Sequence, residues 1–152
     1  MSSTQDFVPT RPRSSSSRRK RTPAHTLARH AVNAALDRKA HDITVMDVRK
    51  VSGVADYFVL CTGDSELQIK AIMESVEHHI EERFGERPWH IEGSDHKQWV
   101  LLDYVDVVVH IFNQEKRAFY SLERLWGDAP MEEVPDEAAS AADVELLQDA
   151  AA

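Results

Sequence analysis

The segment from Trp99 to Phe112 constrains the fold more than any other part of the chain. Two apolar runs flank the short polar stretch Asp103-Tyr-Val-Asp106, and this arrangement predicts a β-hairpin. With the turn placed at Tyr104-Val105, each residue of the first strand lies opposite one residue of the second. Directly opposed residues share a face of the sheet, so the sequence also predicts what each face carries.

The two faces of this predicted hairpin differ in character. One carries only core residues, namely Val100, Leu102, Val107 and Val109. The other carries Trp99, Leu101, Asp103, Asp106, Val108 and His110. Here Asp103 is expected directly opposite Asp106, and like charges in opposed positions lower the stability of a sheet. We interpret this face as a binding surface for a cationic partner, with the Trp99 indole as its anchor. For His110, which this pairing places opposite Trp99, a packed or hydrogen-bonded core position is the main alternative to a contact.

The charge of the chain falls into three blocks. Residues 1–22 hold six basic side chains and one acidic, residues 23–130 hold 12 basic and 18 acidic, and residues 131–152 hold seven acidic and no basic. The acidic central block disfavours nucleic acid as its main partner, because phosphate contacts need a basic surface. A basic protein is the better electrostatic match.

Length and cysteine content set further bounds. A chain of 152 residues has room for one core. The single Cys61 has no internal disulfide partner, which favours a reducing compartment and a buried thiol. No apolar run approaches the roughly 20 residues of a membrane span, and the N-terminal segment lacks the apolar stretch of a secretory signal. We therefore expect a cytoplasmic protein.

Hydrophobic periodicity predicts the remaining elements. Helices are expected at about 23–39, 65–84 and, in one or two pieces, 113–126, and strands at about 43–48, 54–62 and 89–92. The strand at 54–62 is apolar on both faces and is therefore expected at the centre of the sheet. Ser65 and Gln68 form the pattern of a capping box, and Gly85 suits a helix end. Together with the hairpin, these elements predict an α/β domain over residues 23–130, with a mixed sheet of about five strands covered by helices.

Both ends of the chain are expected to be disordered. Residues 1–22 are rich in Ser and Arg, and residues 131–152 are rich in Ala, Glu and Asp. Neither segment has enough apolar surface to offset the entropy of ordering it. The basic segment is expected to be a solvated tail, with an attractant for RNA or another anionic surface as the alternative. A transit peptide is also rich in Arg and Ser, but this segment lacks the apolar residues of an amphipathic helix.

The sequence offers few catalytic patterns. Gly63-Asp-Ser65, at a predicted helix start, resembles a turn that holds phosphates in nucleotidyltransferases, but helix capping explains it more simply. Such an enzyme also needs a carboxylate pair that binds two Mg²⁺ ions, and the best pair here, Asp103 with Asp106, has the wrong spacing. A cluster of ligand-type residues at 90–96 lacks a recognised zinc spacing. No nucleophile motif is present, so we expect a binding protein with no enzymatic activity, metal or cofactor.

Several pieces of the chain resemble the Iojap-like family of ribosomal silencing factors (RsfS). They occur in order over residues 26–130: Asp42-Ile-Thr-Val-Met-Asp-Val48, Ala55-Asp-Tyr-Phe-Val59, Cys61-Thr-Gly63 with Ser65, Glu92-Gly93, Trp99-Val-Leu-Leu-Asp-Tyr104 with Asp106-Val-Val-Val-His110, and Tyr120-Ser-Leu-Glu-Arg-Leu-Trp126. The resemblance implies a fold similar to a nucleotidyltransferase core without its catalytic residues.

The resemblance also implies a function. Members of this family bind the large ribosomal subunit through ribosomal protein L-fourteen, block joining of the subunits and so repress translation, and they are known as homodimers when free. A large-subunit assembly factor is the nearest alternative, and a nucleotidyltransferase a more distant one. The contact residues that the match implies are Glu92, Trp99, Asp103, Asp106, His110, Tyr120 and Glu123.

One position departs from the family pattern. The family usually has Gly in the hairpin turn where this chain has Val105. A two-residue type I′ turn needs positive φ at both central positions, which a β-branched residue resists. We therefore expect either another turn geometry or a shifted register, and a shift of one residue would move Asp103 and Asp106 to different faces.

Overall fold

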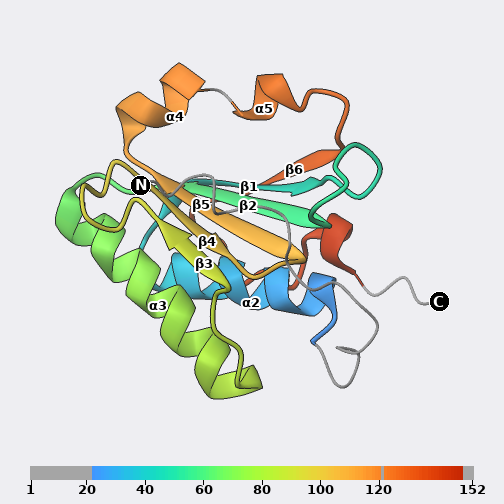
Figure 1. Ribbon diagram of the computed structural model, residues 1–152, viewed down its shortest axis with the longest axis horizontal. Coiled ribbons are helices and arrows are strands. Elements are labelled where there is room, and N and C mark those ends of the chain that lie inside the picture. Colours follow the sequence, from blue (N-terminus) through green and yellow to red (C-terminus); the bar gives the residue numbers. More distant parts are fainter. Residues whose placement is uncertain (1–21, 121, 149–152) are drawn as a thin grey trace.

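The computed structural model describes residues 22–120 and 122–148, with the side chains of residues 118–122 outside the described part. One sheet lies between two layers of helices (Figure 1). The helices are α2 (Ala24–Asp37), α3 (Glu66–Phe84), α4 (Gln114–Tyr120) and α5 (Leu122–Leu125), with a 3-10 helix η2 (Glu145–Leu147). The strands are β1 (His41–Asp47), β2 (Tyr57–Thr62), β3 (His90–Glu92), β4 (Trp99–Asp103), β5 (Val107–Phe112) and β6 (Met131–Val134).

The sheet has six strands in the order β3-β4-β5-β2-β1-β6. Strands β2 and β5 pair in parallel, and every other pairing is antiparallel. Every residue of β2 is buried, as the apolar run on both of its faces predicts. Every residue of β5 is buried as well, although the sequence predicted a binding surface on the face that carries Val108 and His110. The predicted α/β class and mixed sheet are therefore confirmed, with one strand more than expected.

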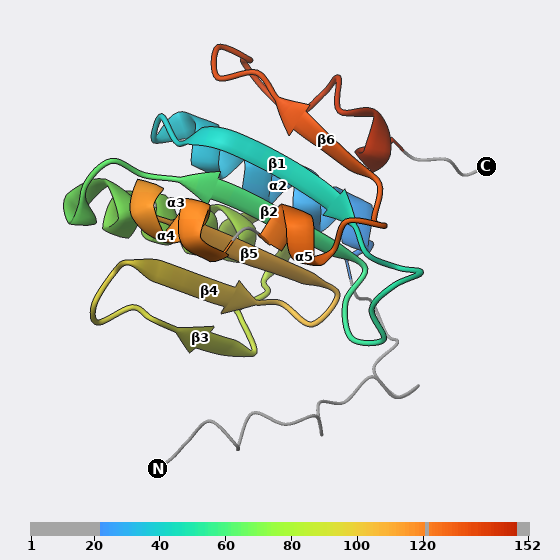
Figure 2. The ribbon, with the colours of Figure 1, turned by 90° about the horizontal axis from the view of Figure 1, so that it is seen from above.

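The sheet separates two apolar clusters. The larger lies beneath α2 and α3, where Leu27, Ala31 and Ile72 pack on Val59 and Val109. The smaller lies on the opposite face, which α4 and α5 cross above β5 and β2 (Figure 2). Strands β3 and β4 lie outside the area that these two short helices cover (Figure 2). That uncovered part of the sheet carries the groove described below.

Local signals place α3 as the sequence predicts. The Ser65 hydroxyl accepts a hydrogen bond from the Gln68 backbone N–H at 3.0 Å, which caps the helix. The Gln68 side chain departs from the capping-box pattern, since its Oε1 accepts from the Asp64 N–H at 2.6 Å rather than from Ser65. Gly85 ends the helix with a φ of +70°, a left-handed conformation that glycine adopts without steric cost.

The prediction that the chain is disordered after Pro130 is wrong for residues 131–148. Strand β6 pairs with β1, and η2 follows it. Val134, Val144 and Leu147 are at most 4% exposed, so a few widely spaced apolar residues contribute to the main core. The other predicted disordered tail, residues 1–22, lies outside the described residues except for Thr22, whose backbone N–H donates to Glu86 Oε2 at 3.0 Å.

The hairpin forms, but its register differs from the predicted one by two residues. Trp99 pairs with Phe112, Leu101 with His110, and Asp103 with Val108. Because side chains alternate with a period of two, a shift of two leaves every side chain on its predicted face. The expected opposition of Asp103 and Asp106 is wrong, since Asp106 lies in the turn.

The cause of the shift is the turn geometry at Val105. This residue has a φ of +79°, and the Asp106 N–H donates to the Tyr104 carbonyl at 3.0 Å. A hydrogen bond that spans three residues around a positive φ is typical of the strained form of the γ-turn. The turn is therefore not of type I′. Its central residue is the β-branched Val105, in a backbone conformation that such residues seldom adopt.

Candidate partner-binding surface

The Trp99 indole lies on the uncovered part of the sheet, and two side chains of β5 contact it there. Its Nε1–H donates to Nδ1 of His110 at 3.1 Å. Its ring lies 5.0 Å from that of Phe112, the residue it pairs with across the hairpin. Trp99 itself is only partly buried. A large amphipathic ring that is fixed on one side and accessible on the other is well suited to anchor a partner.

His110 supports this indole and is itself a core residue. It is 5% exposed, and burial, together with the charge of Arg117, lowers the pKa of its imidazole to about 3. The ring is therefore neutral, and because Nδ1 accepts from Trp99, the proton sits on Nε2. Nε2 is buried without a hydrogen-bond partner among the described residues, and the ring lies 5.0 Å from Phe58 in an edge-to-face arrangement. The packed and hydrogen-bonded alternative for His110 is confirmed.

A groove runs beside Trp99. It has a volume of about 340 Å³ and is lined by Glu92, Gly93, His96, Gln98, Trp99, Leu101 and Lys116. Glu92 is exposed on the edge strand β3, where its Oε2 lies 2.9 Å from Nε2 of His90. The groove therefore brings together two of the predicted contact residues, Glu92 and Trp99, with the apolar Leu101 and with one side chain of opposite charge to Glu92, Lys116.

Gly93 shapes the rim of this groove. It has a φ of +81°, and a Cβ added there would lie 2.0 Å from the backbone oxygen of Trp99. Only a residue without a side chain lets the loop after β3 approach the start of β4 this closely. The glycine of the Glu92-Gly93 pair therefore has a structural reason.

The two aspartates of the hairpin have different environments. Asp103 is 2% exposed, and its Oδ1 accepts from the Val105 N–H at 2.8 Å. Asp106 is partly buried in the turn, and its backbone oxygen accepts from the N–H groups of Asp56 at 2.7 Å and Tyr57 at 3.1 Å. Asp103 thus stabilises the strained turn from inside, while part of Asp106 reaches the surface. The two carboxylates do not form a shared acidic patch.

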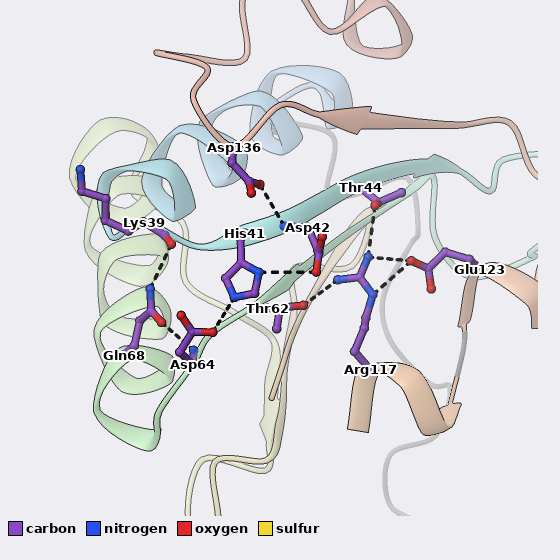
Figure 3. A network of polar contacts seen from close by, with 10 residues as sticks. All are labelled: Lys39, His41, Asp42, Thr44, Thr62, Asp64, Gln68, Arg117, Glu123 and Asp136. Atoms are coloured by element: carbon purple, nitrogen blue, oxygen red, sulfur yellow. Dashed lines mark hydrogen bonds and ion pairs between the residues drawn. The ribbon is translucent and has the colours of Figure 1, made fainter. Parts of the chain in front are cut away.

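Glu123, a further predicted contact residue, is held by an arginine. Its Oε2 accepts from Nη2 of Arg117 at 2.6 Å and from Nε at 3.1 Å, and 31% of its side chain is exposed (Figure 3). The sequence did not identify Arg117, because its partner lies six residues away and outside the usual helical spacing. Tyr120 ends α4, and its side chain lies outside the described residues.

A second and more acidic pocket, of about 600 Å³, lies on the other side of this ion pair. It is lined by Asp42, Ile43, Thr44, Arg117, Glu123, Glu133, Val134, Pro135 and Asp136. Beside it, His41 lies 2.7 Å from Oδ1 of Asp64 and 3.4 Å from Oδ2 of Asp42 (Figure 3). Burial opposes a charge on His41, but the hydrogen bond and charge of Asp64 outweigh it and raise the pKa. Within the described residues, no group of three or more His, Cys, Asp or Glu is placed to hold a metal ion.

The turn at Gly63-Asp-Ser65 is explained by packing and capping. A Cβ at Gly63 would lie 2.8 Å from Cγ1 of Ile69, so glycine lets α3 pack against the end of β2. The Asp64 carboxylate binds His41, and the Ser65 hydroxyl caps α3. Carboxylate charge at this helix start disfavours a phosphate there. Cys61 is buried as expected, and burial raises the pKa of its thiol to about 12.

Known proteins are similar to this chain in both sequence and fold. A family model described as "Ribosomal silencing factor during starvation" (RsfS) matches residues 21–151. The ribosomal silencing factor RsfS of Bacillus subtilis is 44% identical over 101 residues, which cover 66% of this chain and 85% of that protein. Protein Iojap of Zea mays, described as chloroplastic, is 39% identical over 104 residues, or 67% of this chain and 44% of that protein. A crystal structure from Chromobacterium violaceum has a TM-score of 0.67 at 34% identity and covers 70% of this chain and 88% of its own.

A small α/β domain with a supported indole beside a groove has the features of a protein that binds a partner, and the comparisons identify its family. The chain belongs to the RsfS family of ribosomal silencing factors. The resemblance found in the sequence motifs is thereby confirmed. The family is described by a regulatory role rather than by a catalysed reaction. None of the helices in the described part of the chain is long and apolar enough to cross a membrane.

Proposed function

We propose that this protein binds the large ribosomal subunit through ribosomal protein L-fourteen and, by occupying the face where the small subunit docks, blocks subunit joining and represses translation. The observation that carries the proposal is the Trp99 indole, supported by His110 and Phe112 beside a groove whose lining includes Glu92 and Lys116. A rigid aromatic anchor next to a cavity is the usual centre of a protein interface.

The contact residues divide into two groups. Glu92, Trp99, Asp106 and Glu123 form the proposed contact surface, and Tyr120 is added to them on the family resemblance alone. Asp103 and His110, at 2% and 5% exposed, act beneath it. Asp103 stabilises the turn that carries Asp106, and His110 fixes the orientation of the indole. Mutations of these two residues are therefore expected to weaken binding by changing the shape of the surface.

The excess of acidic side chains in this protein supports a basic binding partner. Residues 23–130 carry 18 acidic against 12 basic side chains, and residues 131–152 add seven acidic and no basic. An acidic domain is attracted to a basic ribosomal protein and repelled by bare ribosomal RNA, since phosphate carries the same sign of charge. Recognition of the large subunit is thus expected to go through protein.

The first experiment is co-sedimentation of the purified protein with isolated large subunits, followed by competition with purified L-fourteen. Wild-type protein is expected to pellet with the subunit, and free L-fourteen is expected to release it. Trp99→Ala should weaken binding at least tenfold, since an anchor contributes about 2 kcal/mol or more. Protein that stays in the supernatant at saturating subunit concentration would overturn the proposal.

A matched control separates the anchor from a general effect of losing an indole. Trp89 is 51% exposed and precedes β3, where it follows the alternation of Ile91. Ile91 pairs with Leu102, whose side chain packs in the core under α2 and α3, so Trp89 belongs to the opposite face of the sheet. Trp89→Ala should therefore leave binding unchanged.

The electrostatic part of the proposal has its own test. Glu92→Lys reverses an exposed charge at the rim of the groove and should slow association and reduce its salt dependence. Glu66→Lys makes the same change at the exposed start of α3, on the other face of the sheet, and should affect association much less. Equal effects of the two variants would show that only net charge matters and that the groove is not the contact.

A further inference from the structure

Arg117 joins α4, α5 and the sheet through its own side chain. Its Nη1 donates to Oγ1 of Thr62 on β2 at 3.0 Å, and its Nη2 donates to Oγ1 of Thr44 on β1 at 3.2 Å (Figure 3). The same guanidinium binds Glu123 of α5 through Nε and Nη2. Only 11% of the Arg117 side chain is exposed, and these four hydrogen bonds all lead to other parts of the same chain.

Arg117 also reaches the residues that support the Trp99 anchor. Its guanidinium carbon lies 5.9 Å from the centre of the Phe112 ring, within reach of a cation–π contact. Phe112 in turn packs against Trp99 at 5.0 Å. One side chain therefore connects Glu123 with Trp99, two residues of the proposed contact surface that lie on different elements.

The helices that Arg117 connects are too short to hold their own position. Helix α4 has seven residues and α5 has four, and isolated helices of this length are unstable in water. Leu125 on α5 is 70% exposed, so this side chain adds little buried apolar surface to the helix. Trp126 gives a second attachment, through an edge-to-face contact with Phe58 at 5.7 Å. Among the described side chains, Arg117 and Trp126 thus both help to hold α5 over the sheet.

We propose that Arg117 is a positioning residue for partner binding: it fixes α4 and α5 over the sheet so that Glu123 and Trp99 meet the partner together. This inference rests on the proposed function, which supplies the partner. Arg117 is not proposed as a contact, since only 11% of its side chain is exposed and its guanidinium is already bonded to other parts of the chain. Thr44 and Thr62 are 4% and 0% exposed. Their hydroxyl oxygens accept the hydrogen bonds that attach Arg117 to the sheet.

The experiment compares variants of the full chain by binding to isolated large subunits and by amide hydrogen exchange. Arg117→Ala should weaken binding at least tenfold and speed exchange in residues 114–126 at least tenfold, with exchange in β2 and β5 unchanged. Arg117→Lys keeps the charge without the planar fork and should recover only part of both losses. Thermal unfolding of each variant shows whether the domain itself stays folded.

Thr62→Val is the decisive variant, because Thr62 is fully buried and has no surface to offer a partner. It removes a hydrogen bond to Arg117 at nearly constant volume, and we expect threefold or more weaker binding with faster exchange in 114–126. Ser75→Ala is the matched control: it removes one bond, from Ser75 Oγ to the Ala34 oxygen at 2.9 Å, on the opposite side of the sheet. It should change neither readout.

The outcomes separate the two proposals. If wild-type protein does not bind the subunit, the proposed function fails, while hydrogen exchange still tests whether Arg117 fixes α4 and α5. If wild type binds, and Arg117→Ala loses binding while Thr62→Val keeps it with unchanged exchange, then Arg117 is a direct contact and the positioning role is wrong. Wild-type binding by a folded Arg117→Ala protein would also overturn it.

Discussion

Replacement of Val105 should reverse the usual stability order of alanine and glycine. Val105 has a φ of +79°, which an L side chain adopts at a cost of about 1–2 kcal/mol. Glycine adopts it freely but loses about 0.5–1 kcal/mol more conformational entropy on folding than alanine. The steric term is the larger, so Val105→Gly should be more stable than Val105→Ala by about 1 kcal/mol. Comparing these two variants with each other cancels the loss of the valine side chain, which both share.

The assay is chemical denaturation of both variants, with Val51 as the reference position. Val51 lies in the loop between β1 and β2, is 38% exposed, and is not among the residues with positive φ. There Val51→Ala should be more stable than Val51→Gly by about 0.5–1 kcal/mol, the ordinary order. If alanine were the more stable residue at 105 as well, the positive φ would be refuted, and with it the explanation of the hairpin register.

Three further outcomes are expected. Gly93→Ala should destabilise the domain by about 2 kcal/mol or more in denaturant unfolding, because the new Cβ would lie 2.0 Å from the Trp99 backbone oxygen, and a variant that unfolds like wild type would contradict this. The stability that neutral His110 provides is complete above pH 6.5 and is lost as the pH falls toward about 3, because only the unfolded state takes up its proton. Between pH 6.5 and pH 5, the free energy of unfolding of the wild type should therefore fall by about 2 kcal/mol more than that of His110→Asn, as measured by denaturant unfolding at both pH values. An equal fall in the two proteins would show that His110 does not contribute to the pH dependence. Truncation after Pro130 removes β6 and the buried Leu147 and should abolish cooperative thermal unfolding, since about 5 kcal/mol of burial is a large share of a domain's stability.

The sequence predicted those elements whose signals are local and strong. The apolar run around Phe58 indicated a central strand, and β2 is fully buried. Ser65 and Gly85 marked the two ends of α3 because a capping hydroxyl and a left-handed glycine act within one turn of the helix. Hydrophobic alternation assigned Trp99 to the correct face of its strand, and the shift of two residues did not change that.

Features that depend on distant contacts were not predictable in this way. Leu147 belongs to an Ala- and Glu-rich segment and gains its burial only because α2 and β1 supply a surface for it. The register depends on a strained conformation at Val105, which β-branched residues seldom adopt. Arg117 finds its partners 55 and 73 residues away in sequence, so no local pattern reveals it.

The most direct test of the account is joining of purified ribosomal subunits, followed by sedimentation in the presence of increasing protein. The proposed function predicts that wild-type protein shifts joined ribosomes to free subunits, that Trp89→Ala does the same, and that Trp99→Ala requires at least tenfold more protein. Undiminished joining at a wild-type concentration that saturates the large subunit would contradict the central claim, and would leave a role in assembly of that subunit as the function to test.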